Sequence, residues 1–228
     1  MQLSIALPCF NEEANLRSTI ADVDDWMRSR GIDGEIIAVN DGSADRTAAV
    51  LRELEKQYLR LRTVHHETNR GYGAAVRSGC DAATTEWIGF MDSDGQFHAE
   101  DFDKLIAVAA KSSLVVGRRR RRADPFMRKI NAKCFGFLAW VVLGVWVRDI
   151  NCAMKIYRRD LWLRIRPLHA TGALFNAELF ARARRAGVQW QQVDVSHYPR
   201  TRGMQTGANL LVILRMFKEL AKLYWSLR

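Results

Sequence analysis

Short apolar segments alternate with amphipathic segments along the first half of the chain, and this pattern restricts the fold more than any other feature. Five apolar runs have the length and composition of buried strands, at residues 3–8, 35–40, 61–66, 86–91 and 113–117. Helical spacing of apolar residues follows four of these runs, at about residues 11–30, 50–54, 71–83 and 99–110. Alternating strands and helices predict an α/β protein with a mostly parallel central sheet flanked by helices.

The 228-residue chain is long enough to bury a full core without covalent staples. Its cysteines are scattered and form no CxxC pair: Cys9, Cys80, Cys134 and Cys152. This spacing excludes a disulfide scaffold, argues against a zinc finger and favours a reduced compartment such as the cytoplasm. Cys9 and Cys80 are expected in the core. Residues 1–13 lack the basic start and the cleavage site of a signal peptide, so they predict a first strand instead.

Charge is divided unequally between the two halves of the chain. Residues 1–110 contain 11 basic and 19 acidic side chains, whereas residues 111–228 contain 24 basic and 6 acidic ones. The second half therefore carries a net charge of +18, which suits a polyanion or an anionic membrane surface. Nucleic acid, anionic lipid and a simple solvated basic surface remain alternative interpretations at this point.

Two segments of the basic half have the character of membrane-surface helices. Residues 134–147 contain no charged side chain, but as a helix they would be only about 21 Å long, against ~30 Å for the hydrocarbon core. They therefore predict a buried or interfacial helix. Residues 206–228 combine an apolar stripe with Arg215, Lys218 and Lys222, which predicts a basic amphipathic helix. Because no membrane span is evident in the sequence, any membrane contact is expected to be peripheral.

Polar residues cluster where three of the predicted strands end. Asn11 and Glu12 follow the first strand, Asp41 follows the second, and the pair Asp92 and Asp94 follows the fourth. Ligands bind at the carboxyl ends of the strands in sheets of this kind. These side chains are therefore expected to line one cleft.

The Asp92-Ser93-Asp94 triplet is one of three DxD patterns in the chain, so the pattern alone is weak. The other two pairs fall in predicted helices, where a solvated face is the expected role: Asp22/Asp24 and Asp101/Asp103. Only Asp92 and Asp94 directly follow a strand, where both carboxylates can face one Mg²⁺ or Mn²⁺ ion, with Gln96 as a further oxygen ligand. An acidic turn without a metal is the alternative, and the position in the sequence favours neither.

Two other common kinds of site are not supported. Gly71-Tyr72-Gly73 begins a GxGxxG-like pattern, but Val76 replaces the third glycine, which excludes a nicotinamide-dinucleotide site. His65, His66 and His98 have no partner at metal-ligand spacing. A structural role is therefore expected for each histidine.

Several ordered motifs resemble one enzyme family. They are Pro8-Cys-Phe-Asn-Glu-Glu13, Val39-Asn-Asp-Gly-Ser43, Asn69-Arg-Gly-Tyr-Gly-Ala-Ala75 and Met91-Asp-Ser-Asp-Gly-Gln-Phe-His98. Shorter matches continue at residues 117–118, 149–155, 175–178 and 197–200. Together they resemble the inverting family-2 glycosyltransferases, and within them the dolichol-phosphate mannosyltransferase-like branch of polyprenyl-phosphate sugar transferases. The resemblance implies a GT-A fold, a Rossmann-like nucleotide-binding architecture, over residues 1–205. Residues 1–117 would form its nucleotide-sugar half and residues 118–205 its acceptor half, followed by the amphipathic helix at 206–228.

The resemblance also implies roles for individual residues on the donor side. The nucleotide base and ribose would be lined by Pro8, Asn11, Glu12 and Asp41. The divalent metal and the donor diphosphate would be held by Asp92, Asp94 and Gln96. Asp94 and Arg118 are expected to take part in catalysis, with Arg118 facing the phosphates.

On the acceptor side, the resemblance implies a cationic pocket beside an apolar groove. Further anion-binding residues are expected at Arg128, Lys129, Arg200 and Arg202. Glu178 is expected near the transferred sugar, as a third catalytic residue. A polyprenyl phosphate is already an anion at neutral pH, so it would need no general base. A hydroxyl acceptor would need one, and the candidates by the family pattern are Glu178 and Asp149.

The function implied by the resemblance is a metal-dependent transfer of mannose or glucose from GDP-mannose or UDP-glucose to a polyprenyl or dolichyl phosphate. The expected cofactor is Mg²⁺ or Mn²⁺, and the expected place is the cytoplasmic face of the membrane, with peripheral contact. Many family members carry C-terminal transmembrane helices, so a separate membrane-anchored subunit is a further expected partner. Two alternatives stay open: transfer to a glycan or other hydroxyl, and a non-catalytic basic module that binds nucleic acid. The strand-end carboxylates argue against nucleic acid, because they repel phosphates when no metal is present.

Overall fold

The structure is a computed structural model that describes residues 1–120, 126–172, 174–200, 220 and 223–225, with only the backbone for residues 126–131. The amphipathic helix predicted at 206–228 therefore lies almost entirely outside the described residues. Arg202 also lies outside them, and Arg128 and Lys129 lie where the backbone alone is described.

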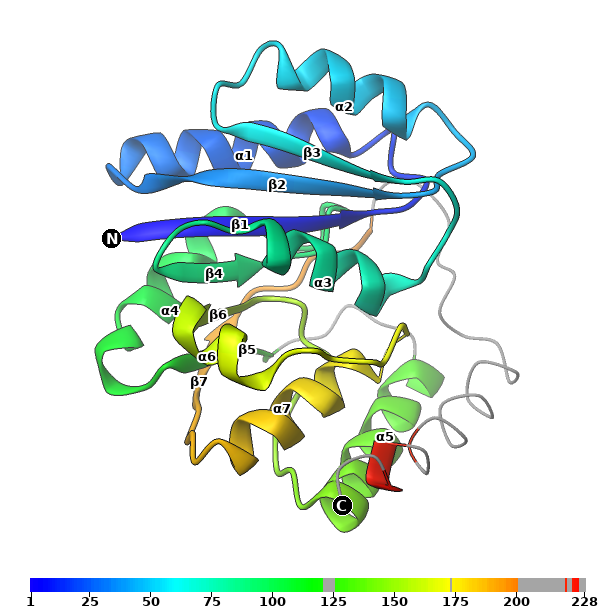
Figure 1. Cartoon of the computed structure of the whole chain (residues 1–228), viewed down its shortest axis with the longest axis vertical. Coiled ribbons are helices and arrows are strands. Elements are labelled where there is room, and N and C mark those ends of the chain that lie inside the picture. Colours follow the sequence, from blue (N-terminus) through cyan, green and yellow to red (C-terminus); the bar gives the residue numbers. More distant parts are fainter. Residues whose placement is uncertain (121–125, 173, 201–219, 221–222, 226–228) are drawn as a thin grey trace.

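The described strands form one seven-stranded sheet in the order β3-β2-β1-β4-β6-β5-β7 (Figure 1). Their bounds are β1 (Gln2–Cys9), β2 (Asp33–Asp41), β3 (Leu61–His66), β4 (Trp87–Phe90), β5 (Leu114–Arg119), β6 (Lys155–Arg158) and β7 (Gln191–Val195). Every neighbouring pair is parallel except the two pairs that involve β6, which runs antiparallel to β4 and β5. The five predicted strands and the mostly parallel sheet are confirmed, whereas β6 and β7 were missed.

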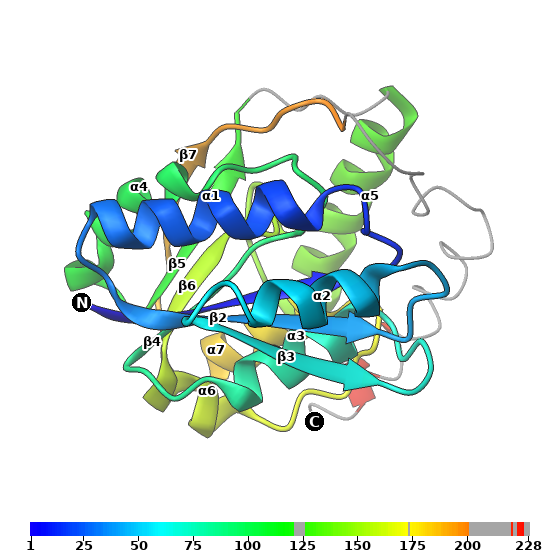
Figure 2. The same ribbon diagram turned by 90° about the horizontal axis from the view of Figure 1, so that it is seen from above.

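The described helices cover both faces of the sheet (Figure 2). Their bounds are α1 (Leu16–Ser29), α2 (Thr47–Glu55), α3 (Tyr72–Ala82), α4 (Phe102–Ile106), α5 (Phe126–Leu143), α6 (Arg159–Ile165) and α7 (Phe175–Arg185). The helix predicted at 99–110 is instead the short α4 with a 3₁₀ turn on each side, at Ala99–Asp101 and Ala109–Lys111. The helix predicted at 134–147 begins earlier and ends at Leu143, where Gly144 takes a φ of +64°.

Alternation along the central strands divides the core into two apolar clusters. Ile36 and Ala38 of β2 pack in the cluster that contains residues of α1, α2 and α4. Ile37 and Val39 pack in the other cluster, which contains residues of α3, α5, α6 and α7. Successive side chains of a strand point to opposite faces, so a strand buried on both faces reads as a continuous apolar run. This explains why β1, β2 and β4 were recognisable from the sequence.

The parallel strands bring their carboxyl ends to one edge of the sheet. Cys9 pairs with Asn40 and Asp41 pairs with His66, and the arrowheads of β1 to β4 point the same way (Figure 1). The segments that follow these strands therefore meet at this edge, as the sequence predicted. Cys9 and Cys80 are buried in the core, and burial raises the pKa of each thiol to about 12.

Of the two DxD pairs expected on solvated helix faces, only Asp101 is buried, so the expectation was wrong for that residue. Asp22, Asp24 and Asp103 are partly exposed. Asp101 is buried and accepts a hydrogen bond from the backbone amide of Ser196 at 2.5 Å. Asp22 accepts one from the amide of Ala99 at 2.8 Å, and Asp103 accepts one from the Trp26 indole at 3.0 Å. These carboxylates join α1 and the residue that follows β7 to the segment around α4. Among the described residues, no helix combines the length and apolarity needed to cross a membrane.

Candidate active site

The loops that follow β1 and β2 are fastened to each other by hydrogen bonds. The Asn11 amide donates to Ser43 Oγ at 3.0 Å, and Asn11 Oδ1 accepts from the Ala44 amide at 2.9 Å. The Glu12 amide donates to Thr47 Oγ1 at 2.8 Å. Asn11 itself has a φ of 55°, in the left-handed region that Asn tolerates better than most residues. The backbone at this corner is therefore fixed before any ligand binds.

Arg200 lies between two carboxylates at the same edge. Its Nη2 donates to Glu12 Oε1 at 2.8 Å, and its Nη1 lies 3.5 Å from Asp94 Oδ2. Glu12 is only 8% exposed and also accepts from Asn15 Nδ2 at 2.7 Å. Burial raises the pKa of Glu12, while Asn15 and Arg200 oppose that rise. The resemblance assigned Glu12 to the nucleotide, Asp94 to the metal and Arg200 to anion binding on the acceptor side. The structure places Arg200 against both carboxylates.

The loop that carries Asp92 and Asp94 is held from two sides. Ser93 Oγ donates to the Pro8 carbonyl at 2.7 Å, which ties the loop to β1. Asp94 Oδ1 accepts from the Gln96 amide at 3.0 Å. Gln96 Nε2 donates to the Tyr198 carbonyl at 3.0 Å, so the Gln96 side chain also ties this loop to the segment that carries Arg200. Pro8, Asp94, Gln96 and Arg200 thus belong to one connected structure.

The ionised form of Asp92 is unfavourable in the folded protein. Burial raises the pKa of Asp92 to about 7, and the neighbouring Asp94 carboxylate adds to the rise. The Tyr72 hydroxyl and the positive charges of Arg119 and Lys155 oppose this rise, because they favour the ionised form of Asp92. Burial raises the pKa of Tyr72 well above its usual value, so the hydroxyl keeps its proton. A cation placed beside Asp92 and Asp94 would relieve the excess negative charge.

The donor atoms at this loop suit a hard divalent cation. Asp92 and Asp94 offer carboxylate oxygens, and Gln96 has an amide oxygen on the same loop. Within the described residues, no group of three His, Cys, Asp or Glu side chains is arranged to hold a metal ion. Mg²⁺ and Mn²⁺ are commonly held by one or two carboxylates together with substrate phosphates. The residues present therefore fit a metal that is shared with a diphosphate.

Asp41 is buried and holds the loop before α3. It is 2% exposed, and its Oδ1 accepts from the Arg70 amide at 2.9 Å while its Oδ2 accepts from the Gly71 amide at 2.8 Å. His66 Nδ1 lies 2.7 Å from Asp41 Oδ1. The structural role expected for His66 is thus evident. Asp41, expected to bind the base or ribose, also has a role inside the protein.

Two consecutive arginines at the end of β5 have different partners. Arg118, expected to face the phosphates, pairs with Asp194 of β7 at 2.5 Å. Arg119 donates from Nε and Nη2 to Asp149 at 2.7 and 2.8 Å, and this pair is buried. Arg119 is the one whose charge lowers the pKa of Asp92. The sequence prediction missed Arg119. The two arginines are adjacent and identical in type, and they differ only in the face of the sheet to which each side chain points.

Glu178 is buried and holds a neighbouring backbone segment by hydrogen bonds. It is 0% exposed, and its Oε2 accepts from the backbone amides of His169 and Ala170 at 2.8 and 2.7 Å. Its Oε1 accepts from Arg182 Nε at 2.8 Å. The segment that it holds reaches the start of α3, because the Gly73 amide donates to the Thr171 carbonyl at 2.7 Å. Glu178 thus supports the start of α3 indirectly, through the backbone of residues 169–171. Its carboxylate already accepts hydrogen bonds from three protein donors.

Lys155 was not predicted as a site residue, although it lies in one of the quoted motifs. It is fully buried and donates to the Cys152 carbonyl and, at 2.9 Å, to Asn176 Oδ1. Its Nζ lies 5.0 Å from the centre of the Phe90 ring, on the strand that leads to Asp92. Burial lowers the pKa of Lys155 to about 8. The sequence did contain a signal for this residue, because Lys155 lies between the apolar pairs Ala153-Met154 and Ile156-Tyr157.

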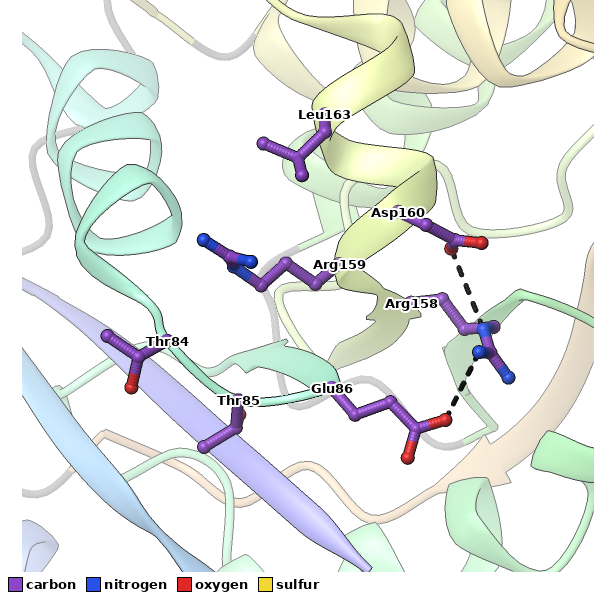
Figure 3. Close-up of a pocket in the computed structure, with 7 residues that line it drawn as sticks. All are labelled: Thr84, Thr85, Glu86, Arg158, Arg159, Asp160 and Leu163. Carbon is purple, nitrogen blue, oxygen red and sulfur yellow. Dashed lines mark ion pairs between the residues drawn. The ribbon is translucent and has the colours of Figure 1, made fainter.

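A separate pocket of about 220 Å³ lies at the opposite edge of the sheet (Figure 3). It is lined by Thr84, Thr85, Glu86, Arg158, Arg159, Asp160 and Leu163. These residues precede β4, end the antiparallel β6 or belong to α6, so they lie at the end of the sheet remote from Asp92. Arg158 is paired with Glu86 and Asp160 at 3.2 and 3.6 Å. The pocket is not part of the candidate active site.

Comparison with known proteins assigns the fold and the family. The chain superimposes on glucosyl-3-phosphoglycerate synthase from Mycobacterium tuberculosis, crystallised with Mn²⁺, UDP and phosphoglyceric acid, with a TM-score of 0.73 at 20% identity over 99% of this chain and 78% of that one. This likeness confirms the GT-A fold.

Two curated relatives are polyprenyl-phosphate sugar transferases. A dodecaprenyl-phosphate galacturonate synthase from Rhizobium johnstonii is 34% identical over 165 residues, which cover 71% of this chain and 49% of the relative. The chain therefore spans about half the length of that relative. A dolichyl-phosphate beta-glucosyltransferase from Saccharomyces cerevisiae is 28% identical over 94% of this chain and 74% of its own length. The model of the family described as Glycosyl transferase family 2 matches residues 4–166. The chain therefore belongs to glycosyltransferase family 2.

Proposed function

We propose that the protein transfers a hexose from a nucleotide-diphosphate sugar to a polyprenyl phosphate, with inversion. The observation that carries this proposal is the cluster of Glu12, Asp94 and Arg200 beside Asp92, at the carboxyl edge of the sheet of a family-2 glycosyltransferase. The two curated relatives act on lipid-linked phosphates by name. Those names contain galacturonate and a glucosyl group but no mannose, which supports glucose over mannose as the transferred sugar.

We further propose that Asp92, Asp94 and Gln96 hold a Mg²⁺ or Mn²⁺ ion. Such an ion supplies positive charge where the diphosphate leaving group becomes more negative. Arg200 and Arg119 add fixed positive charge to the same region, since one contacts Asp94 and the other lowers the pKa of Asp92. Charge stabilisation by preorganised groups is often the largest single contribution to catalysis.

The partners of the two candidate bases favour a phosphate acceptor. A hydroxyl acceptor needs a carboxylate that can take a proton, whereas a polyprenyl phosphate attacks as an anion. Glu178 already accepts three protein hydrogen bonds, one of them from Arg182. Asp149 is paired with Arg119 at 2.7 Å. The oxygens of both carboxylates are thus already engaged by protein donors, which leaves neither group placed to take a proton from an acceptor.

We propose that the aromatic surface formed by Phe137, Trp140, Val141 and Trp146 lies on the cytoplasmic face of a bilayer. All four side chains are exposed, Trp146 by 62%. The Trp140 ring lies 5.9 Å from Phe137 and 5.7 Å from Trp146, so the rings form one continuous patch. Aromatic side chains favour the membrane–water interface, and the basic second half of the chain suits anionic lipid.

Sedimentation with vesicles tests the membrane proposal. Vesicles that contain anionic phosphatidylglycerol should carry down the wild-type protein but much less of Trp140→Ser/Trp146→Ser. Leu59→Ser is the matched control, because Leu59 is fully exposed outside the aromatic surface. Equal sedimentation of all three proteins would contradict the proposal. A wild-type protein that stays in solution would instead favour delivery of the acceptor by a separate membrane-anchored subunit.

The transfer itself is tested by a product assay. Purified protein is incubated with polyprenyl phosphate, Mg²⁺ or Mn²⁺ and either UDP-glucose, UDP-galacturonate or GDP-mannose, and the organic phase is analysed by mass spectrometry. A lipid-phosphate-sugar should form, and it should disappear with EDTA or with Asp94→Ala. Asp160→Ala, at the opposite edge of the sheet, should retain activity. Nucleotide release without a lipid product would contradict the lipid acceptor and direct the search to hydroxyl acceptors.

A further inference from the structure

Ser78, His66 and Asp41 form a chain of polar contacts beside the site. None of the three is among the proposed metal ligands. Ser78 Oγ lies 2.9 Å from His66 Nε2, and His66 Nδ1 lies 2.7 Å from Asp41 Oδ1. His66 and Asp41 are 8% and 2% exposed, so water does not replace these contacts. A carboxylate only accepts hydrogen bonds, so His66 Nδ1 is the donor to Asp41 Oδ1.

His66 fixes α3 at two points. Through Asp41 it supports the amides of Arg70 and Gly71, which directly precede the helix. Through Nε2 it contacts Ser78, which lies within α3 itself. Ser78 is six positions beyond Tyr72, about 9 Å along a helix. A shift or a rotation of α3 would therefore break one contact or the other.

The first residue of α3 connects this support to the carboxylate pair. Tyr72 follows Gly71, and its hydroxyl lowers the pKa of Asp92 by favouring the ionised carboxylate. Gly71 has a φ of +93°, and a Cβ there would lie 2.5 Å from the Thr171 carbonyl oxygen, so the backbone has little freedom to move. The position of the Tyr72 hydroxyl is thus set by the same contacts that hold Asp41.

We propose that His66 is a positioning residue that couples the nucleotide pocket to the metal carboxylates. It contacts Asp41 directly on the nucleotide side. On the metal side it acts through the start of α3, which places Tyr72 toward Asp92. The inference rests on the proposed function, because it assigns the two sides of the network to nucleotide and metal. Loss of His66 should therefore weaken binding of both.

The neighbouring histidine provides a matched control. His65 is the preceding residue of β3, so its side chain points to the other face of the sheet, where it is exposed. Its Nδ1 lies 3.3 Å from Asn40 Nδ2 and not near Asp41 or α3. The same substitution at two adjacent positions therefore separates the network from a general effect of removing a histidine.

The test measures binding, with Mn²⁺ followed by electron paramagnetic resonance and UDP and GDP followed by calorimetry. His66→Ala should raise Kd for Mn²⁺ and for the preferred nucleotide by about tenfold each, which corresponds to 1.4 kcal/mol. His66→Asn should largely restore both, because its amide can donate to Asp41 from the position of Nδ1. His65→Ala should leave both unchanged. Ser78→Ala removes only the outer contact and should raise both Kd values about threefold, so it keeps the test valid if His66→Ala does not fold.

The outcomes separate the inference from the proposed function. If folded His66→Ala and Ser78→Ala bind Mn²⁺ as the wild type does, the coupling is overturned, even if nucleotide binding weakens. If His66→Asn is no better than His66→Ala, the hydrogen bond to Asp41 is not what positions the site. A wild-type protein that binds neither Mn²⁺ nor nucleotide would overturn the proposed function itself.

Discussion

Arg200 donates from Nη2 to Glu12 Oε1 at 2.8 Å, although 188 positions separate the two residues in the chain. The contact joins the basic second half of the sequence to the acidic first half at the carboxyl edge of the sheet. Because Arg200 also lies 3.5 Å from Asp94, one guanidinium serves two carboxylates that a donor diphosphate and its metal would approach. The segment after β7 is thereby fixed at the site.

Removal of this guanidinium should destabilise the protein. In Arg200→Met, Glu12 stays buried without its ion partner, and breaking one side of a buried pair costs about 3 kcal/mol. The pKa of Glu12, already raised by burial, should rise further. Urea unfolding at pH 7 measures the loss, and Glu12→Gln/Arg200→Met should recover much of it. Equal stability of the wild type and the single variant would show that the pair contributes nothing.

Metal affinity should increase as the pH is raised from 6 to 8. Burial and the Asp94 charge raise the pKa of Asp92 from 3.8 to about 7, so a proton must leave before a cation can bind. Titration of Mn²⁺ by electron paramagnetic resonance at pH 6, 7 and 8 should show a Kd that falls across this range. Asp160→Asn should keep this dependence, and a Kd that does not vary with pH would contradict the prediction.

The same raised pKa predicts how stability depends on pH without metal. Between about pH 4 and 7 the folded protein retains a proton on Asp92 that the unfolded chain has lost. The stabilisation from this group is therefore complete below about pH 4 and disappears as the pH rises through 7. The difference in unfolding free energy between the wild type and Asp92→Asn should fall over this range in urea titrations with EDTA. A constant difference would place the pKa of Asp92 in its usual range.

Glu178→Gln should reduce stability as well as activity. The amide can accept with only one atom, so the amides of His169 and Ala170 or the Arg182 guanidinium lose a partner, at a cost of about 2 kcal/mol. Thermal unfolding and turnover should be measured on the same preparation. Abolished turnover in a protein of wild-type stability would instead indicate a general base, and with it a hydroxyl acceptor.

Two glycine substitutions should have opposite effects. A Cβ at Gly73 would lie 2.5 Å from the Ala170 carbonyl oxygen and 2.8 Å from Phe175 Cβ, so Gly73→Ala should cost about 2 kcal/mol. Gly136 lies inside α5 with nothing within 4 Å of its Cβ position. Gly136→Ala should stabilise the protein by about 1 kcal/mol, because alanine favours helix. Chemical unfolding of both variants measures the contrast, and a destabilised Gly136→Ala would contradict it.

Local sequence patterns predicted β1 to β5 and missed β6 and β7, which are short or carry several polar residues. β1, β2 and β4 are continuous apolar runs, whereas β7 reads Gln-Gln-Val-Asp-Val and buries only Val195. β6 is four residues long with a charged residue at each end. Such segments become strands because neighbouring strands offer hydrogen bonds, and this depends on context more than on intrinsic preference.

The sequence by itself determined that Asn11, Glu12, Asp41, Asp92 and Asp94 meet at one edge, because apolar periodicity and strand–helix alternation are local and parallel strands end together. Only the tertiary structure decided the partners of these residues. Arg200 reaches Glu12, Arg119 rather than Arg118 acts on Asp92, and Glu178 is bound to backbone amides. These contacts depend on how deeply each side chain is buried and on the face of the sheet to which it points. Both properties arise from the packing of segments far apart in the chain.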